Sequence, residues 1–155
     1  MELIKEIPFA FFAAAGFGVL FQAPKKSLIA GGLTGMIGWI VFRILGIFGL
    51  PHVLTIFAAA VVVAVLGELM ARLYRTPVTV FTVAGIVPLV PGSLAYSTMY
   101  HLAKGDYLEG LALGTKTFLA AGAIAAGLVF IGALARAVKY RGERSVAEFT
   151  VNHQK

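Results

Sequence analysis

The fold is decided by an apolar stretch that carries no charge and is interrupted twice by proline, TVAGIVPLVPGSLAYS at residues 82–97. Proline has no N–H and clashes with the carbonyl four residues earlier, so Pro88 and Pro91 predict a break in a helix. The carbonyls that they would free are those of Ala84 and Val87. Because lipid offers no hydrogen-bond partners, such a break has to be buried in protein or line a wet cavity.

Composition places the whole chain in a membrane. Of its 155 residues, 59% are hydrophobic and only 13% are charged, about half the charged share of a soluble domain. The net charge of +6 sits beside hydrophobic runs and does not form the basic patch of a nucleic-acid-binding protein. There is no cysteine, and no motif for catalysis, a cofactor or a metal can be assembled, His52, His101 and His153 included. The sequence predicts neither an enzyme nor a cofactor site.

Charges and turn residues divide the chain into five apolar tracts. The sequence therefore predicts an all-α membrane protein with five transmembrane helices, the fourth broken at Pro88–Pro91. Residues 1–140 are expected to form a single transmembrane domain, and residues 141–155 a cytoplasmic polar tail. The five tracts are residues 7–24, 28–49, 53–74, 78–102 and 108–135.

Lysine and arginine give the orientation. Five spans put the two termini on opposite faces, and most basic residues fall on the face that holds the C-terminus. We therefore expect the C-terminus in the cytoplasm and the N-terminus outside. The first tract could instead be a signal peptide, but two glutamates in its charged region argue against that alternative.

The break is the main candidate binding site. Pro91 can begin a second half-helix and leave the N–H groups of Gly92 and Ser93 unpaired, which favours a ligand carboxylate. Ser93, Tyr96, Ser97 and Tyr100 then share one face of that half-helix and are expected to point inward. The alternative is a simple kink, with tyrosines at the membrane interface.

Ionisable residues within the tracts are further candidates, because charge inside a membrane is costly. Lys116 can reach the ligand or can extend to the interface. Glu68 is a candidate proton-coupling carboxylate, or it pairs with Arg72 one helical turn away. Arg43 is interpreted as an interfacial anchor. Outside these charges, small-residue pairs such as Gly31/Gly35 and Gly110/Gly114 either pack the bundle or meet a partner.

Several motifs, in their order and spacing, resemble the threonine/serine exporter family, in its small five-helix form. They are Val87-Pro88-Leu89-Val90-Pro91-Gly92-Ser93 with Phe81, Tyr96 and Met99 around it, Phe17-Gly18-Val19-Leu20-Phe21 before Pro24-Lys25, Gly35-Met36-Ile37-Gly38-Trp39, and Gly105-Asp106 before a glycine-rich last helix. The resemblance covers most of the chain up to about Ala135.

This resemblance implies a proton-driven exporter in the inner membrane for threonine, serine or, in some relatives, a dicarboxylate. The chain is similar to the C-terminal half of full-length members, which implies a second five-helix subunit. Pro88, Pro91, Gly92 and Ser93 match the motif, and their contact with substrate is inferred from the helix break. Two alternatives from other classes are a structural or regulatory membrane subunit and a small pore former.

Overall fold

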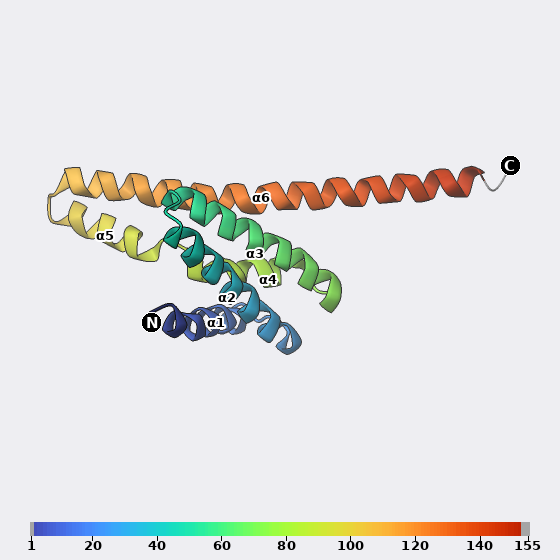
Figure 1. The fold of residues 1–155 in the computed structure, drawn as a ribbon, viewed down its shortest axis with the longest axis horizontal. Coiled ribbons are helices and arrows are strands. Elements are labelled where there is room, and N and C mark those ends of the chain that lie inside the picture. The colour runs from blue at the N-terminus through green and yellow to red at the C-terminus, as the bar shows by residue number, and fades with distance from the viewer. Residues whose placement is uncertain (1, 153–155) are drawn as a thin grey trace.

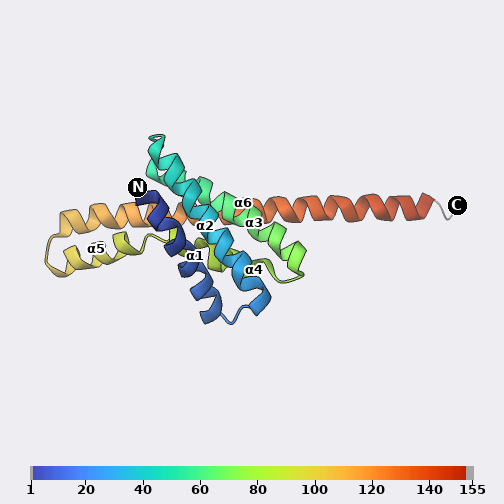
Figure 2. The same cartoon turned by 60° about the horizontal axis from the view of Figure 1, so that its bottom comes forward.

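The computed structural model describes the backbone of residues 2–152 and the side chains of residues 5–138, and this part of the chain is helical without a strand. The all-helical class is confirmed. Figures 1 and 2 show α6 as a long spine, with α3 along it and α2 between α3 and α1. The elements are α1 (Glu2–Leu20), α2 (Lys25–Ile47), α3 (His52–Tyr74), α4 (Val78–Ile86), the 3₁₀ turn η1 (Val87–Leu89), α5 (Gly92–Ala103) and α6 (Tyr107–Asn152).

Proline sets where three of the helices begin. Pro24, Pro51 and Pro77 immediately precede α2, α3 and α4, each with φ between −53° and −54° and an extended ψ. This fixed φ leads into a helix whose first N–H groups have no intrahelical acceptor in any case. The turn from α5 into α6 uses Gly105 at a φ of +82°, which glycine adopts without a side-chain clash.

Three helices are long and apolar enough to cross a membrane, namely α2, α3 and the Tyr107–Val138 part of α6. The helical segments 78–89 and 92–103 pass the same test as a pair bent by 54°. The described residues therefore hold three candidate spans, or up to four if the bent pair counts as one. Because α1 is not among them, the predicted count of five is not confirmed. α1 begins at Glu2, ahead of the expected start at Ile7, and so includes Glu6.

Small residues let the helices pack closely around α4. Val63, Ala59 and Ala60 of α3 are fully buried, as is Phe81 of α4. A methyl group on Gly85 of α4 would lie 2.8 Å from side-chain carbons of α2 and α3. In lipid, van der Waals packing and not the hydrophobic effect holds helices together. These close approaches therefore position the broken segment.

Most of the predicted small-residue faces also pack inside the molecule. A Cβ on Gly35 would lie 2.5 Å from that of Ala14, and one on Gly110 would lie 2.7 Å from Leu102. Gly127 approaches Ala60 in the same way. For these faces the structure supports internal packing over a partner contact. Gly122 differs, because it is exposed and a Cβ there would meet nothing within 4 Å.

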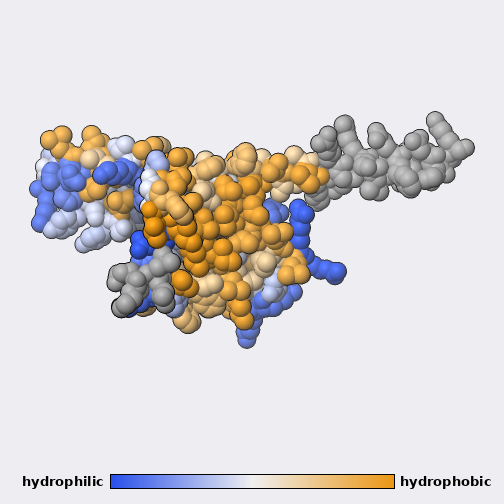
Figure 3. Space-filling model, viewed as in Figure 1, coloured by the Kyte–Doolittle hydropathy of each residue, from blue (hydrophilic) through white to orange (hydrophobic). Residues whose placement is uncertain are grey.

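The last helix continues beyond the predicted span. α6 was expected to end near Ala135, before a polar tail at residues 141–155, but its backbone stays helical to Asn152. Residues 153–155, His153 among them, lie outside the described residues. Figure 3 shows apolar side chains over α2, α3 and the middle of α6, and more hydrophilic ones at the end where α5 turns into α6. This pattern fits the multi-pass membrane protein that the composition predicts.

Candidate functional site

The predicted break lies where the two prolines place it. α4 ends at Ile86, η1 covers Val87–Leu89, and α5 starts at Gly92 after an extended Val90 with a ψ of 129°. The two helical segments that flank the break meet at 54°. The prediction of a broken fourth helix is confirmed, and the break is held between α1, α2 and α3 by contacts of α4 and η1.

The carbonyls expected to be free at the break are in fact paired. The Val87 N–H donates to the Ala84 carbonyl, and the Val90 N–H donates to the Val87 carbonyl at 3.3 Å. The prediction was wrong because the chain tightens into a 3₁₀ turn, which bonds each carbonyl to an N–H three residues later. The break therefore offers a ligand cation no obvious carbonyl at these two positions.

The amide groups at the start of α5 match the prediction in part. The Gly92 N–H donates to the Val90 carbonyl at 2.7 Å, because Pro91, with φ −75° and ψ 54°, forms an inverse γ-turn. Gly92 is thus not a free donor. Within the described chain, the N–H groups of Ser93 and Leu94 have no backbone acceptor, and the first bond back from α5 is from Ala95 to the Pro91 carbonyl at 3.0 Å. Two donors with positive partial charge remain at this helix start.

A cavity of about 460 Å³ opens beside these donors. Pro88, Pro91 and Ser93 line it, as the sequence predicted for the break. Its other walls come from α2 and α3 and were not predicted. Those residues are Trp39, Phe42, His52 and Ile56. Sequence position alone put His52 in a turn, and only the packing of the α2–α3 hairpin brings it to the break.

Beyond Ser93, the polar face of α5 does not turn toward this cavity. Tyr96 is 72% exposed and stacks on Tyr100, with 6.4 Å between ring centroids. Ser97 is half-buried and does not line the cavity. The expectation that this face points into the bundle was wrong for the isolated chain, since α5 packs mainly on α6 and extends beyond the other helices (Figure 1).

The two charged candidates lie away from the break. Lys116 is exposed, and no residue of α6 lines the cavity at the break. Glu68 is half-buried and borders a separate hollow of about 480 Å³ with Arg72 and Arg136. It lies twelve residues along α3 from Ile56, or about 18 Å by helix rise. Among the described side chains, Glu68 forms no ion pair with Arg72.

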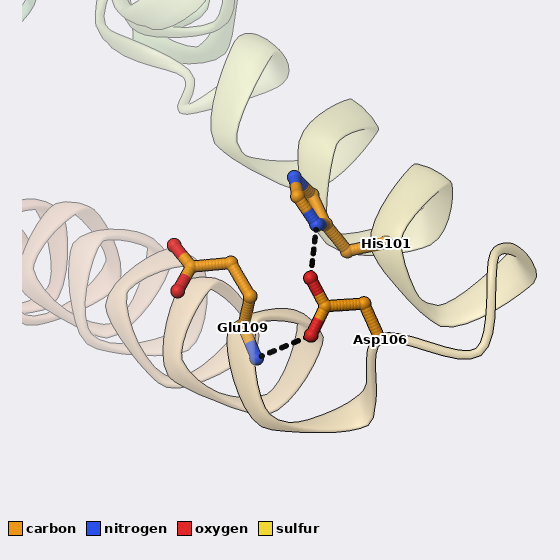
Figure 4. A network of polar contacts seen from close by, with 3 residues as sticks. All are labelled: His101, Asp106 and Glu109. Carbon is orange, nitrogen blue, oxygen red and sulfur yellow. Dashed lines mark hydrogen bonds and ion pairs between the residues drawn. The ribbon is translucent and has the colours of Figure 1, made fainter.

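Side-chain contacts hold the turn between α5 and α6. Asp106 accepts a 3.1 Å hydrogen bond from His101 Nδ1 and a long one from the Glu109 N–H at 3.5 Å, as Figure 4 shows. Lys104 sits 4.4 Å above the Tyr100 ring. In the part of the chain that the structure describes, no cluster of three metal-binding side chains occurs. Asp106 therefore acts as the N-cap of α6.

With this geometry in place, comparison with known proteins decides the family. The family described as "Threonine/Serine exporter, ThrE" matches residues 6–134, which include α1 from Glu6 on, the break and α6 up to Leu134. The chain belongs to the threonine/serine exporter family. The resemblance seen in the sequence motifs is thereby confirmed.

Two relatives show how much of a longer protein this chain matches. An uncharacterized protein of Haemophilus influenzae is 30% identical over 142 residues, which are 86% of this chain and 48% of the relative. A threonine/serine exporter of Corynebacterium glutamicum is 34% identical over 116 residues, 72% of this chain and 24% of the relative. The chain thus spans half or less of either relative. No solved structure matches it.

Proposed function

We propose that this chain is a transport subunit for small amino acids such as threonine and serine, and that the break at Pro88–Ser93 is its substrate site. The observation that carries the proposal is a discontinuous helix with two unpaired N–H groups beside a cavity of about 460 Å³. Known transporters build their sites in this way, with half-helix N-termini directed at anionic groups. The cavity volume is within the range of small-molecule sites.

In this proposal the backbone holds the substrate carboxylate. The N–H groups of Ser93 and Leu94 donate to it, and Gly92 keeps the approach open because nothing lies within 4 Å of where its Cβ would be. The paired carbonyls of Ala84 and Val87 leave the substrate ammonium to another group. Pro88 and Pro91 preserve the bend that exposes the donors.

The exposed polar face of α5 supports a second subunit. Tyr96, Ser97 and Tyr100 lie on a helix with one principal neighbour, α6. Polar groups left facing lipid are costly, so a further helical subunit would cover this face and close the site. The half-length match to the Haemophilus influenzae relative fits such an arrangement. Tyr96 and Ser97 would then contact the substrate from the covered face, with Lys116 near by on α6.

The remaining assignments concern the membrane. We place α1 as the first of five spans in the cell membrane, with the N-terminus outside and the C-terminus in the cytoplasm. Glu68 is the proposed proton-coupling carboxylate, because it is half-buried in a hollow at a distance from the break. Coupling at a distance would need α3 and α4 to move together, and they are in direct contact.

Efflux from preloaded cells tests the proposal. Cells expressing this chain alone, a candidate five-helix partner alone, or both together are loaded with labelled threonine or serine, and the initial rate of loss is measured. Export that requires both chains supports a two-subunit carrier. If no combination exports threonine, serine or a dicarboxylate, the transport proposal is wrong and a structural subunit becomes the better interpretation. Loss of membrane potential on expression would instead indicate a pore former.

A further inference from the structure

A partly exposed ion pair joins α1 to α2 beside the break. Arg43 Nε lies 2.8 Å from Glu6 Oε2, and the Trp39 indole N–H donates to the same oxygen at 3.1 Å. The Arg43 Nε–H is not aligned on that oxygen, so the contact is an ion pair without a formed hydrogen bond from Nε. The side chains of Arg43 and Glu6 are 39% and 31% exposed. Both side chains are therefore only partly buried, although the Arg43 Nε atom itself is enclosed.

The pair borders the proposed substrate site. Glu6 lines a hollow of about 240 Å³ together with Trp39 and Pro88, and those two residues also line the larger cavity at the break. On its other side, Arg43 borders a hollow of about 450 Å³ that shares Phe42 and His52 with the same cavity. Trp39 and Phe42, with ring centroids 5.3 Å apart, form the wall between these spaces.

Few other ionisable residues lie near this pair: Lys5 precedes Glu6 on α1, and His52 lines the cavity at the break. α1 packs against α2, α4 and η1, and neither α4 nor η1 contains an ionisable residue. On α2, the other charged residues are Lys25 and Lys26 at the opposite end of the helix. Among the described side chains, Glu6 and Arg43 are the opposite charges that adjoin the break. In lipid, separating them without replacement would leave two uncompensated charges, which is strongly unfavourable.

We infer that Glu6 and Arg43 together bind the zwitterionic head of an α-amino acid, with the Arg43 guanidinium on the carboxylate and the Glu6 carboxylate on the ammonium. When Glu6 and Arg43 separate, the ammonium and carboxylate of a zwitterion replace the ion-pair contact that each side chain loses. The net free-energy cost of separating the pair is therefore small. Guanidinium binds a carboxylate through two parallel N–H donors, which fixes its orientation. Glu6 also supplies the ammonium partner that the paired carbonyls at the break do not. This inference rests on the proposed function and narrows its substrate class.

The arrangement selects against dicarboxylates. A substrate with a second carboxylate in place of the ammonium would bring like charge to Glu6. A substrate without a carboxylate would leave Arg43 unpaired. Threonine and serine satisfy both residues, whereas succinate satisfies only Arg43. The amides of Ser93 and Leu94, which line the same cavity as Trp39, then receive the carboxylate as it moves on from Arg43.

Uncharged variants of Glu6 and Arg43 distinguish a substrate-binding role of this ion pair from a purely structural one. Glu6→Gln, Arg43→Gln and the double variant are compared for initial threonine efflux, with Glu109→Gln and Lys26→Gln as exposed controls. We expect each single variant to lower the rate by roughly tenfold or more, and the double variant to stay equally low. A purely structural ion pair would behave differently. Removing one charge leaves the other uncompensated and lowers efflux, whereas removing both leaves no uncompensated charge and returns efflux toward the wild-type rate. Recovery of the double variant to the wild-type rate would overturn the inference.

A binding measurement keeps this test independent of transport. The melting temperature of the detergent-purified chain, with its partner where one is needed, is measured with L-threonine, threonine methyl ester and succinate. Of the three compounds, we expect only L-threonine to raise the melting temperature of the wild type, and none of them to raise that of the single variants. If the wild type exports threonine and all the variants match it, the zwitterion site is wrong and the proposed function stands. If threonine is neither exported nor stabilising, both are wrong.

Discussion

Gly35 is the point at which three elements come closest to one another. Where its Cβ would stand, Ala14 of α1 is 2.5 Å away, and the Gly85 carbonyl and Pro88 Cγ are each 3.4 Å away. Glycine is required here by space and not by backbone conformation, since Gly35 lies within α2. One missing side chain thus lets α1, α4 and η1 pack together at the broken helix.

The first prediction follows from this contact. Gly35→Val should destabilise the folded chain by about 1–3 kcal/mol, because a side chain would force α1 away from the break. Gly122→Val is the matched control, since nothing lies within 4 Å of the Cβ position at Gly122. Melting temperatures of the two variants in detergent provide the comparison. Equal melting temperatures would mean that α1 does not pack as described.

At the level of residues, the sequence predicted the site only where the cause is local. Proline acts on its own backbone, so Pro88 and Pro91 could be assigned from sequence alone. Trp39 and His52 reach the same cavity through the packing of α2 against α3 and α4, which no local pattern encodes. Glu6 lies one residue before the first apolar tract, and no local pattern indicates its contact with Arg43, 37 residues later.

At the level of elements, the backbone carbonyls at the break are hydrogen-bonded and are not left free. The sequence predicted which bonds the prolines remove but not that η1 and the γ-turn at Pro91 would replace them. Local geometry settles this, since a 3₁₀ turn can bond carbonyls that an α-helix cannot reach past proline. What survives the replacement is the pair of donors at Ser93 and Leu94. Ser93 and Leu94 line the cavity at the break, where the two helical segments meet at 54°.

The second prediction tests this bend. Replacing both prolines, as Pro88→Ala and Pro91→Ala together, restores N–H groups that can continue the helix from α4 into α5. Threonine efflux should fall by roughly tenfold, about 1.4 kcal/mol, while the amount of protein in the membrane stays the same. Pro77→Ala, at the start of α4, is the control and should leave efflux near the wild-type rate. Unchanged efflux in the double variant would contradict a role for the bend.

The third prediction concerns the face of α5 that carries Tyr96. The natural chain has no cysteine, so single cysteines can be introduced without removing others. Tyr96→Cys should react rapidly with a maleimide when the chain is expressed alone, because this position is 72% exposed. Coexpression with a five-helix partner should slow the reaction severalfold, whereas Tyr107→Cys, at the exposed start of α6, should keep its rate. Equal rates at Tyr96→Cys with and without the partner would exclude this face as the interface.

At the level of the whole molecule, the sequence predicts five spans, whereas the structure holds three helices that are long and apolar enough to cross a membrane. The two counts differ in whether α1 and the bent pair of α4 and α5 are included. α2, α3 and the Tyr107–Val138 part of α6 are long and apolar enough to cross a membrane, and α4 with α5 are so only if the bent pair counts as one span. The sequence counted apolar tracts and so reached five. Composition can identify a tract, but the number of crossings depends on where each end of each helix lies relative to the membrane.

The fourth prediction places those ends. Lys5→Cys, Gly49→Cys and Gly105→Cys should react with a membrane-impermeant maleimide in intact cells, because five spans put all three outside. Gln22→Cys and Arg75→Cys should react only after permeabilisation, since basic loops stay in the cytoplasm. The pair Lys5 and Gln22 decides α1, because both would be labelled from one side if α1 did not cross. The pair Arg75 and Gly105 decides the bent helix in the same way. Labelling of all five positions with the sides exchanged would keep five spans and reverse the orientation, which would place the Glu6–Arg43 pair toward the cytoplasm.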